Sequence, residues 1–571
     1  MPIFSTIVET HRIFLLRLKQ SLSWIGFALM LLCLMFVLTH YIFSTFQPVR
    51  WPTKIYFFLS LFLALGSRKW STFFVLFSLP LFPELHIQAE YIFRPAVKYF
   101  ISYPGIDIIA GFCLGQWARL LLIEKQPLGV VFCPPPWPLG LLTLVLSGSV
   151  VIAIARNLWQ SDQAFTFIEL INSAIRFKFL SRTDNYFPLA DLVIYSFCGL
   201  LIVNLLYAYR ETQQKDDLIF KPVLVGLLVS GLLGLIQAFT SWGLPTNTSS
   251  YRAESFGFGA QGFQPDLHAF AAHMLVGTVG LLGFIVCSKS SKVRAVAILI
   301  SAVCWLALIL SKSRASFMFA VLATTALFIC LMLSYPTKKS HRFFAIGVFI
   351  AGIFGFAALT NNLSWIGKVY EDLTVANFSN FGDLNVIFRS RIETHGAAMR
   401  MGFSYPFYGI GQGNFFRLSS IFEFSRSPYM VQMKGENAHN YFLQTFAEVG
   451  IVGILCFALA FLYPILKTKP YKVQVPAMIA IISIFLGNIF SHSLITRENL
   501  FLLAGFLALL YALEENSNQS KTSEPRIQQN SYGVLVKDGV LFIIASLLIC
   551  LATFEVLSSF YRFPFVFETL K

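Results

Sequence analysis

The chain has 571 residues, 56% of them hydrophobic and only 12% charged, which leaves too little polar surface for a water-soluble globule. Its 61 Phe, 21 Tyr and 9 Trp likewise exclude a disordered chain. The formal net charge of +15 would suggest nucleic acid in a soluble protein, but in so apolar a chain it fits basic loops at the cytoplasmic ends of membrane spans, and we expect no nucleic-acid partner.

Apolar runs close to the ~20 residues that a membrane-crossing helix needs recur along the chain. The first run follows Arg12, Arg17 and Lys19 and lacks a cleavage-type site, so we expect it to remain as the first span. We predict an all-α polytopic membrane protein with about 14–15 transmembrane helices and one large loop. The predicted apolar segments are 22–46, 54–67, 70–84, 105–124, 139–156, 189–209, 221–241, 268–287, 294–311, 315–334, 342–360, 441–466, 475–492, 497–513 and 539–561.

Loops rich in Lys and Arg set the predicted orientation, because such loops stay in the cytoplasm. They occur at 66–69, 210–221, 288–294, 335–342 and 467–472, and all fall on the cytoplasmic side if the N-terminus is inside. The same alternation places other segments on the outer face of the membrane: 157–188, 242–267, 311–314, 361–440 and 493–496.

The largest hydrophilic segment, 361–440, is expected to form a compact helical lid, because loops of that length are usually functional. Polar residues at 514–538 predict a disordered cytoplasmic linker. The expected organisation is then a set of N-terminal transmembrane helices (1–188), a transmembrane core that includes the large loop (189–513), the linker (514–538) and a C-terminal transmembrane helix (539–571).

Basic residues on the outer side depart from the usual charge pattern and are therefore informative. Ser311-Lys312-Ser313-Arg314 forms an outer turn between two spans, where hydroxyls, free N–H groups and an arginine at a helix start favour an anion. An interfacial arginine that reaches for water is the alternative.

Further arginines lie on the same face. Arg252 precedes a Gly-rich outer stretch, where a surface pair with Glu254 is the alternative interpretation. The large loop adds Arg389, Arg391, Arg400, Arg417 and Arg426. A planar guanidinium that stays charged suits bidentate binding of a diphosphate, so these arginines predict such a ligand.

The last large outer element is GENAHNYFLQTFAEVGIVG, residues 435–453. His439 and Asn440 stand where the loop ends and a helix begins, and a histidine there is often only a cap or an interfacial residue. Gln444 and Glu448 are four residues apart and therefore share one helical face. Glu448 lies nine residues from His439, on the opposite side of a straight helix. Another outer cluster is interpreted as an ion pair that closes a turn: His492, Arg497 and Glu498.

Three motifs in this order resemble the O-antigen ligase and O-antigen polymerase superfamily, nearest to the ligases: SKSRAS at a span start, YPFYGIGQGNF in the large loop, and AHNYFLQTFAEVGIVG after it. The resemblance covers roughly 230–510. It implies a bacterial inner-membrane, multi-pass, inverting glycosyltransferase whose active site faces the periplasm. Carried over, His439 is the catalytic base or an orienting group, and Arg314 and Arg252 hold the diphosphate. The chain departs from relatives at 264–266, where it has Gln-Pro-Asp in place of the frequent Pro-Asn pair.

The donor implied by the resemblance is a glycan on undecaprenyl diphosphate, held in the lipid bilayer. Charge develops on the leaving diphosphate, so arginines aimed at it stabilise the transition state; Arg389 and Arg391 are weaker candidates than the two above. An imidazole suits removal of the acceptor's proton, and we expect Asn440, Gln444 and Glu448 to support His439. No Asp-x-Asp or carboxylate cluster occurs on the outer side and no CxxC pair occurs in the chain, so we predict neither a metal nor another cofactor.

The sequence leaves the acceptor open. It could be lipid A–core (a ligase), another lipid-linked glycan (a polymerase) or a protein Ser or Thr hydroxyl, although no extra soluble C-terminal domain is evident. A transporter of polysaccharide or a small anion is the alternative outside enzymes. Transporters place charges near the bilayer midplane and often carry inverted repeats, whereas the charges here gather on one face.

Overall fold

The computed structural model describes residues 2–44, 54–81, 104–161, 166–176, 184–210, 215–240, 242, 259–264, 267–281, 290–334, 391–421, 424, 436–467, 474–489, 494 and 499–521. Every regular element within these ranges is helical. Seven of the helices are long and apolar enough to cross a membrane: Ile13–Thr39, Gly105–Ile123, Trp137–Gln160, Pro188–Tyr209, Lys221–Thr240, Ser291–Leu310 and Tyr441–Leu466. The prediction of an all-α polytopic membrane protein is therefore confirmed.

The first half of the chain builds one side of the helix bundle. Here α1 packs along α7, α2 packs along α5, and α9 contacts α1, α5 and α7. The elements are α1 (Pro2–Ser44), α2 (Ile55–Gly66), α3 (Arg68–Ser78), η3 (Leu79–Leu81), α5 (Pro104–Ala118), η5 (Arg119–Ile123), α6 (Leu128–Val131), α7 (Trp137–Gln160), α8 (Phe167–Arg176) and α9 (Pro188–Arg210).

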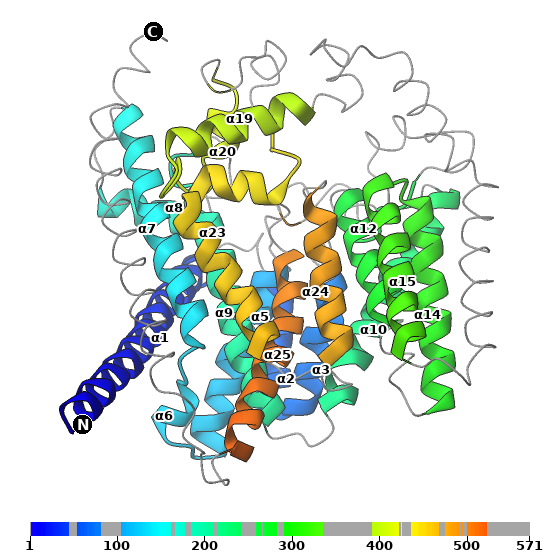
Figure 1. Ribbon diagram of the computed structural model, residues 1–571, viewed down its shortest axis with the longest axis horizontal. Helices are drawn as coiled ribbons and strands as arrows, with labels where there is room; N and C mark the ends of the chain where they lie inside the picture. The colour runs from blue at the N-terminus through cyan, green and yellow to red at the C-terminus, as the bar shows by residue number, and fades with distance from the viewer. Residues whose placement is uncertain are drawn as a thin grey trace.

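The second half adds a group of helices on the right of Figure 1, formed by α10, α12, α14 and α15. Helix α24 contacts α23 as well as α12 and α15, so it joins this group to the rest. The elements are α10 (Lys215–Thr240), α12 (Leu267–Leu275), η7 (Val276–Gly280), α14 (Ser291–Leu310), α15 (Arg314–Ser334), α19 (Arg391–Ser404), α20 (Phe415–Leu418), α23 (Tyr441–Lys467), α24 (Gln474–Ile489) and α25 (Asn499–Lys521).

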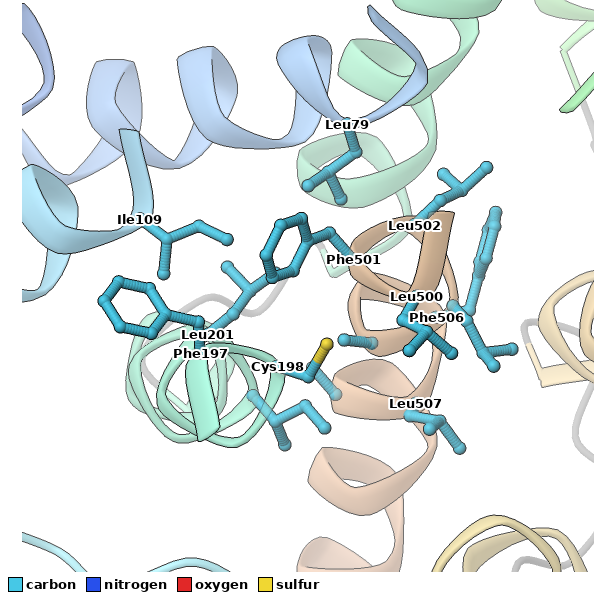
Figure 2. Close-up of a cluster of buried hydrophobic side chains, with 14 of the residues drawn as sticks. Leu79, Ile109, Phe197, Cys198, Leu201, Leu500, Phe501, Leu502, Phe506 and Leu507 are labelled. Atoms are coloured by element: carbon cyan, nitrogen blue, oxygen red, sulfur yellow. The ribbon is translucent and has the colours of Figure 1, made fainter. Parts of the chain in front are cut away.

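The centre of the bundle is α25, whose residues 499–512 are all buried. A helix that is apolar on every side has to be surrounded by other helices, and α25 packs mainly against α9. Figure 2 shows Phe501 of α25 directed toward Leu201 of α9 and Ile109 of α5. All three side chains are fully buried. This apolar contact fixes α9, and α9 in turn supports the polar residues described below.

The two ends of the bundle differ in their polar contacts. Arg119 Nε lies 2.8 Å from Glu124 Oε1, and Arg68 also pairs with Glu124. Arg119 Nη1 donates to the carbonyl of Gly66 at 2.8 Å. The basic loop 66–69 is thus fixed near α6, at the end of the molecule opposite α19 and α20 in Figure 1.

Two predicted apolar segments, 342–360 and 539–561, lie outside the described residues, as does most of the expected linker 514–538. Helix α25 continues to Lys521, into the start of that expected linker. The apolar segment predicted at 441–466 is present as α23, but the helix is broken at Gly450.

Candidate active site

Helices α19 and α20 and residues 441–449 form a small layer at one end of the bundle, here called the loop layer (Figure 1). It has a hydrophobic core of its own, separate from the main core. The buried members of that core are Ala398, Met401, Ile410, Phe415, Leu418, Phe424, Ala438 and Ala447. The described part of the large loop is therefore packed and helical.

The break in α23 is filled by residues 405–411, here called the crossing segment. Gly450 has φ 61° and ψ −166°, so the helix changes direction there. Ile451 N donates to Pro406 O at 2.7 Å, and Ile410 N donates to Ala447 O at 2.8 Å. A helix break leaves N–H and C=O groups without partners inside the helix. The crossing segment supplies those partners, so break and segment form one unit.

Two glycines permit this close crossing. A Cβ built on Gly409 would lie 2.4 Å from the backbone carbon of Glu448, and one built on Gly450 would lie 2.4 Å from that of Phe407. Both glycines also have positive φ, 73° and 61°, which residues with a side chain adopt at a cost. Gly409 is thus required by the backbone of Glu448, and Gly450 by the backbone of Phe407.

Arg156 of α7 binds the crossing segment through hydrogen bonds to Ile410 and Tyr408. Its side chain is only 3% exposed, and its Nη1 donates to Ile410 O at 2.9 Å. Its Nη2 donates to the hydroxyl of Tyr408. The guanidinium also lies over the rings of Tyr405 and Tyr408, 5.4 Å and 5.0 Å from their centroids.

Sequence analysis missed Arg156, because a single arginine at the end of an apolar run is indistinguishable from an interfacial one. Its partner Ile410 is 254 residues away. The only signal available in the sequence was an arginine without an acidic neighbour at the end of a span on the predicted outer side.

The residues that follow the crossing segment bind α7 and α9. Gln412 Nε2 donates to Asp191 Oδ2 at 2.8 Å, and Gln412 N donates to Ser149 Oγ at 2.9 Å. Asn157 Nδ2 donates to Asn414 Oδ1 at 3.1 Å. The GQGN part of the loop motif therefore holds the loop layer onto the N-terminal helices.

His439 lies just before α23 with φ 48°, in the left-handed region. Its N–H donates to Asn437 Oδ1 at 2.9 Å. Asn440 Oδ1 accepts the N–H of Leu443 at 3.0 Å, so Asn440 is the N-cap of the helix. The side chain of His439 is thus not needed for capping. Of the two structural explanations for this histidine, a helix cap and an interfacial residue, the first is removed.

Gln444 and Glu448 share a face of α23, as their spacing predicts. Gln444 Nε2 donates to Glu448 Oε1 at 3.3 Å, and Gln444 Oε1 accepts the N–H of Ala438 at 3.2 Å. Glu448 is 4% exposed and also accepts the N–H of Phe415 at 3.2 Å. The pair links the His439 peptide to α20 and to the kinked part of α23.

His395 of α19 is a second histidine at this place, and sequence analysis did not select it. Its ring lies close enough to the backbone of His439 for that backbone to raise its pKa, against the larger effects that follow. Burial, and then the guanidinium of Arg391 one turn earlier, lower the pKa of His395 below its ordinary 6.5. The ring is therefore mainly neutral at pH 7. We call His395, Asn437, His439, Gln444 and Glu448 the His439 cluster.

A second polar cluster surrounds the predicted outer turn at 311–314. Ser313 Oγ lies 3.1 Å from His268 Nδ1 and donates to Ser316 Oγ at 3.2 Å. The residue before it, Lys312, has φ 59°. Ala260 N donates to Leu310 O at 3.0 Å, which ties the segment 259–264 to the same turn. We call His268, Ser313 and Ser316 the Ser313 cluster.

The segment 259–264 is itself fixed by Gln237 of α10. Gln237 Oε1 accepts the N–H of Gly262 at 2.6 Å, and its Nε2 donates to Gly262 O at 3.0 Å. The Gly-rich stretch predicted between two spans thus comes back to the start of α15, as the outer-face assignment of 242–267 and 311–314 requires.

Where the structure describes them, the predicted site residues belong to these two clusters or lie next to them. Arg391 begins α19 and acts on His395, and Asn440, Gln444 and Glu448 surround the His439 peptide. Arg314 begins α15, beside the Ser313 cluster. Several predicted residues lie outside the described ranges: Arg252, Arg389, His492, Arg497 and Glu498.

Within the described ranges, no three His, Cys, Asp or Glu side chains are grouped so that they could hold a metal ion. Six cysteines in these ranges are free: Cys33, Cys113, Cys133, Cys198, Cys304 and Cys456. The predicted absence of a metal and of a cofactor stays a prediction.

The fold and these clusters define an all-α polytopic membrane protein with one polar cluster at the helical loop layer and a second at the turn between α14 and α15. Residues 296–458 match the family model described as O-antigen ligase. The predicted resemblance to the O-antigen ligase superfamily is thereby confirmed, and the family implies a glycosyltransferase-like membrane enzyme. A search of curated proteins found no match. The matched segment contains the 311–314 turn, the large loop and His439, but neither Arg156 nor Asp191.

Proposed function

We propose that the protein is an inverting glycosyltransferase that moves a glycan from undecaprenyl diphosphate to an acceptor hydroxyl. The reaction takes place on the periplasmic face of the bacterial inner membrane, and lipid A–core is the favoured acceptor. The observation that carries this proposal is the family match across 296–458, within which His439 is held in a left-handed conformation between α19 and α23.

In this reaction the acceptor oxygen attacks the anomeric carbon of the glycan. The bond from that carbon to the diphosphate breaks, the diphosphate leaves with the electron pair, and the configuration inverts. The imidazole of His439 takes the hydroxyl proton as the new bond forms. Arg314 and Arg252 stabilise the charge on the leaving diphosphate, with Arg389 and Arg391 as further candidates.

The local structure supports a division of labour between the clusters. The Ser313 cluster combines hydroxyls with the start of α15, where free N–H groups and the helix dipole favour an anion. In the His439 cluster, the neutral His395 adds no positive charge beside His439.

A polymerase and a protein O-oligosaccharyltransferase share this donor chemistry and differ only in the acceptor. A transporter remains the alternative outside enzymes. The gathering of Arg156, Asp191, His439 and Glu448 near one end of the bundle favours transfer over transport, because a transport pathway needs polar residues near the bilayer midplane.

The test is transfer by purified protein in detergent. Wild type and His439→Ala are incubated with a glycan on undecaprenyl diphosphate and with lipid A–core, and both products are followed by gel mobility. We expect the wild type, but not His439→Ala, to place glycan on lipid A–core, and we expect the control His11→Ala, in the first part of α1, to remain active.

Other products would change the conclusion. Longer lipid-linked chains with unmodified core would make the protein a polymerase. Equal transfer by wild type and His439→Ala would remove His439 as the base. No transfer by the wild type to any of the three acceptor classes would reject the proposed function.

A further inference from the structure

The end of the bundle opposite the loop layer carries a group of charged side chains that the proposed transfer reaction does not use (Figure 1). Glu124 there lies between two arginines: Arg119 Nε is 2.8 Å from Glu124 Oε1, and Arg68 pairs with the other carboxylate oxygen. Arg119 Nη1 also donates to the carbonyls of Leu65 and Gly66, at 3.0 Å and 2.8 Å. These bonds fix the turn between α2 and α3 against the end of η5.

Two lysines stand next to this ion pair. Lys69 follows Arg68 and Lys125 follows Glu124, so the contact of Arg68 with Glu124 brings both lysines to the same place. Both lysines are exposed, and neither forms an ion pair with the residues that the structure describes. Lys125 has φ 51°. Glycine would adopt that conformation at less cost, so the turn itself gives no reason for a lysine.

The charge at this place is not balanced. The segments that build it, 55–81 and 119–131, contain four cationic side chains and one carboxylate, a net charge of +3. The arginines are bound to Glu124, whereas the lysines are exposed. An exposed surface with an excess of one charge attracts ligands of the opposite charge, here an anion. We call the five charged residues the basic cluster: Arg68, Lys69, Arg119, Glu124 and Lys125.

Exposed apolar side chains flank the basic cluster. Trp70 is 60% exposed, Leu122 75% and Leu128 64%. The apolar helix Gly105–Ile123, which is long enough to cross a membrane, ends two residues before Lys125 and so places the cluster at the bilayer surface. Tryptophan favours the level of the lipid headgroups, and lysine lays its stem on apolar surface while its ammonium group reaches the headgroups.

We propose that the basic cluster binds the headgroup phosphate of an anionic phospholipid. Lys69 and Lys125 contact the phosphate, and the exposed apolar side chains around them contact the acyl chains. A soluble anion would satisfy the lysines but leave the apolar side chains in water. A zwitterionic lipid brings an ammonium group that cancels the charge of its phosphate. An anionic phospholipid satisfies both parts of the surface. This inference does not depend on the proposed transfer reaction.

The test measures lipid binding by purified full-length protein in a neutral detergent. Phosphatidylglycerol and phosphatidylcholine with the same acyl chains are added, and bound lipid is followed by native mass spectrometry. We expect the first phosphatidylglycerol to bind wild type about tenfold more tightly than Lys69→Gln/Lys125→Gln, and phosphatidylcholine to bind both proteins equally. Lys69→Arg/Lys125→Arg keeps the charge and should bind phosphatidylglycerol as wild type does.

Arg17→Gln/Lys292→Gln is the matched control, because it removes two exposed cationic side chains on the same predicted side of the membrane. We expect it to bind phosphatidylglycerol as wild type does, and thermal unfolding in detergent verifies that each variant is folded. Equal weakening in both Gln variants would mean that overall charge attracts the lipid, which overturns the proposal.

Two further results would also overturn the proposal. Unchanged binding by Lys69→Gln/Lys125→Gln would show that these lysines do not contact the lipid. Displacement of phosphatidylglycerol by an equal concentration of glycerol phosphate would show that a soluble anion binds as well as the lipid.

Discussion

Single residues in unusual backbone conformations mark both polar clusters. Among the described residues, positive φ outside glycine occurs at Lys125, Lys312 and His439. Two of these three belong to the motifs that pointed to the superfamily. Such conformations cost free energy and persist where the surrounding structure holds them, frequently at active sites. Lys312 stands before α15 and His439 stands before α23, so both strained residues lie next to or among the proposed site residues.

Arg156 offers a test at the residue scale. Arg156→Met keeps the length of the side chain but leaves Ile410 O and the Tyr408 hydroxyl without their donor. We expect the free energy of unfolding in detergent to fall by roughly 1–3 kcal/mol, because a buried acceptor without a donor has lost its hydrogen bond to water and gains none in the protein. Transfer should fall as the crossing segment loosens. Arg17→Met, at an exposed position of α1, is the control and should change neither quantity.

The stability should also depend on pH through His395. Because its pKa is lowered in the folded protein, the neutral ring contributes stability that is complete above 6.5 and is lost as pH falls through the lower folded value. His395→Asn cannot titrate. We therefore expect the unfolding temperature of wild type to drop more than that of the Asn variant between pH 7.5 and pH 5. Parallel curves for the two proteins would contradict the prediction.

At the scale of elements, the central feature is the set of backbone hydrogen bonds that joins the crossing segment to the break in α23. The first part of α23 runs beneath α19 and the rest descends into the bundle (Figure 1). One helix thus connects the loop layer to the membrane-embedded core. A straight helix through residues 441–467 would carry 441–449 away from α19 and separate His439 from His395.

Glycine substitutions test whether this close crossing is needed. Gly409→Ala and Gly450→Ala each place a Cβ 2.4 Å from backbone atoms of the other element and require a positive φ. We expect each to cost about 1–3 kcal/mol of stability and at least tenfold in transfer. Gly129→Ala in α6 is the matched control, since nothing lies within 4 Å of its Cβ. Wild-type behaviour of Gly450→Ala would mean that the helix tolerates a straight course.

At the scale of the whole molecule, the segment that matches the family does not form its site alone. Its loop is bound by Ser149, Arg156 and Asn157 of α7 and by Asp191 of α9, all of which precede residue 296. Helices α7 and α9 therefore support the loop layer. No motif in residues 1–188 predicted this role.

We expect removal of residues 1–188 to abolish transfer and to expose the loop at 391–421 to proteolysis. Co-expression of 1–188 as a separate chain should restore part of both properties, because α1 and α7 pack on α9 and α23 through side-chain contacts. Limited proteolysis followed by mass spectrometry gives the cleavage sites. Full activity of the shortened protein would show that α7 is dispensable for the loop layer.

Helical periodicity and hydropathy are local properties, and what depends on them could be predicted from the sequence. The apolar runs predicted the seven helices that are long and apolar enough to cross a membrane, but not α6, α8, α19 or α20. The four-residue spacing predicted the contact of Gln444 with Glu448, and three short motifs predicted the resemblance to the superfamily. What depends on residues far apart in the chain could not be predicted. The partners of Arg156 and Gln412 are 254 and 221 residues away, so packing alone brought them together.

The sequence by itself determined that this is a helical membrane protein that resembles the O-antigen ligase superfamily, because burial in lipid demands apolar helices and each motif is one continuous stretch of the chain. Only the tertiary structure decided that α23 breaks at Gly450, that Arg156 binds the crossing segment, and that the His395 ring lies close to the backbone of His439. Each of these depends on a hydrogen bond or a close backbone approach between distant segments. Such contacts exist only once the helices have packed.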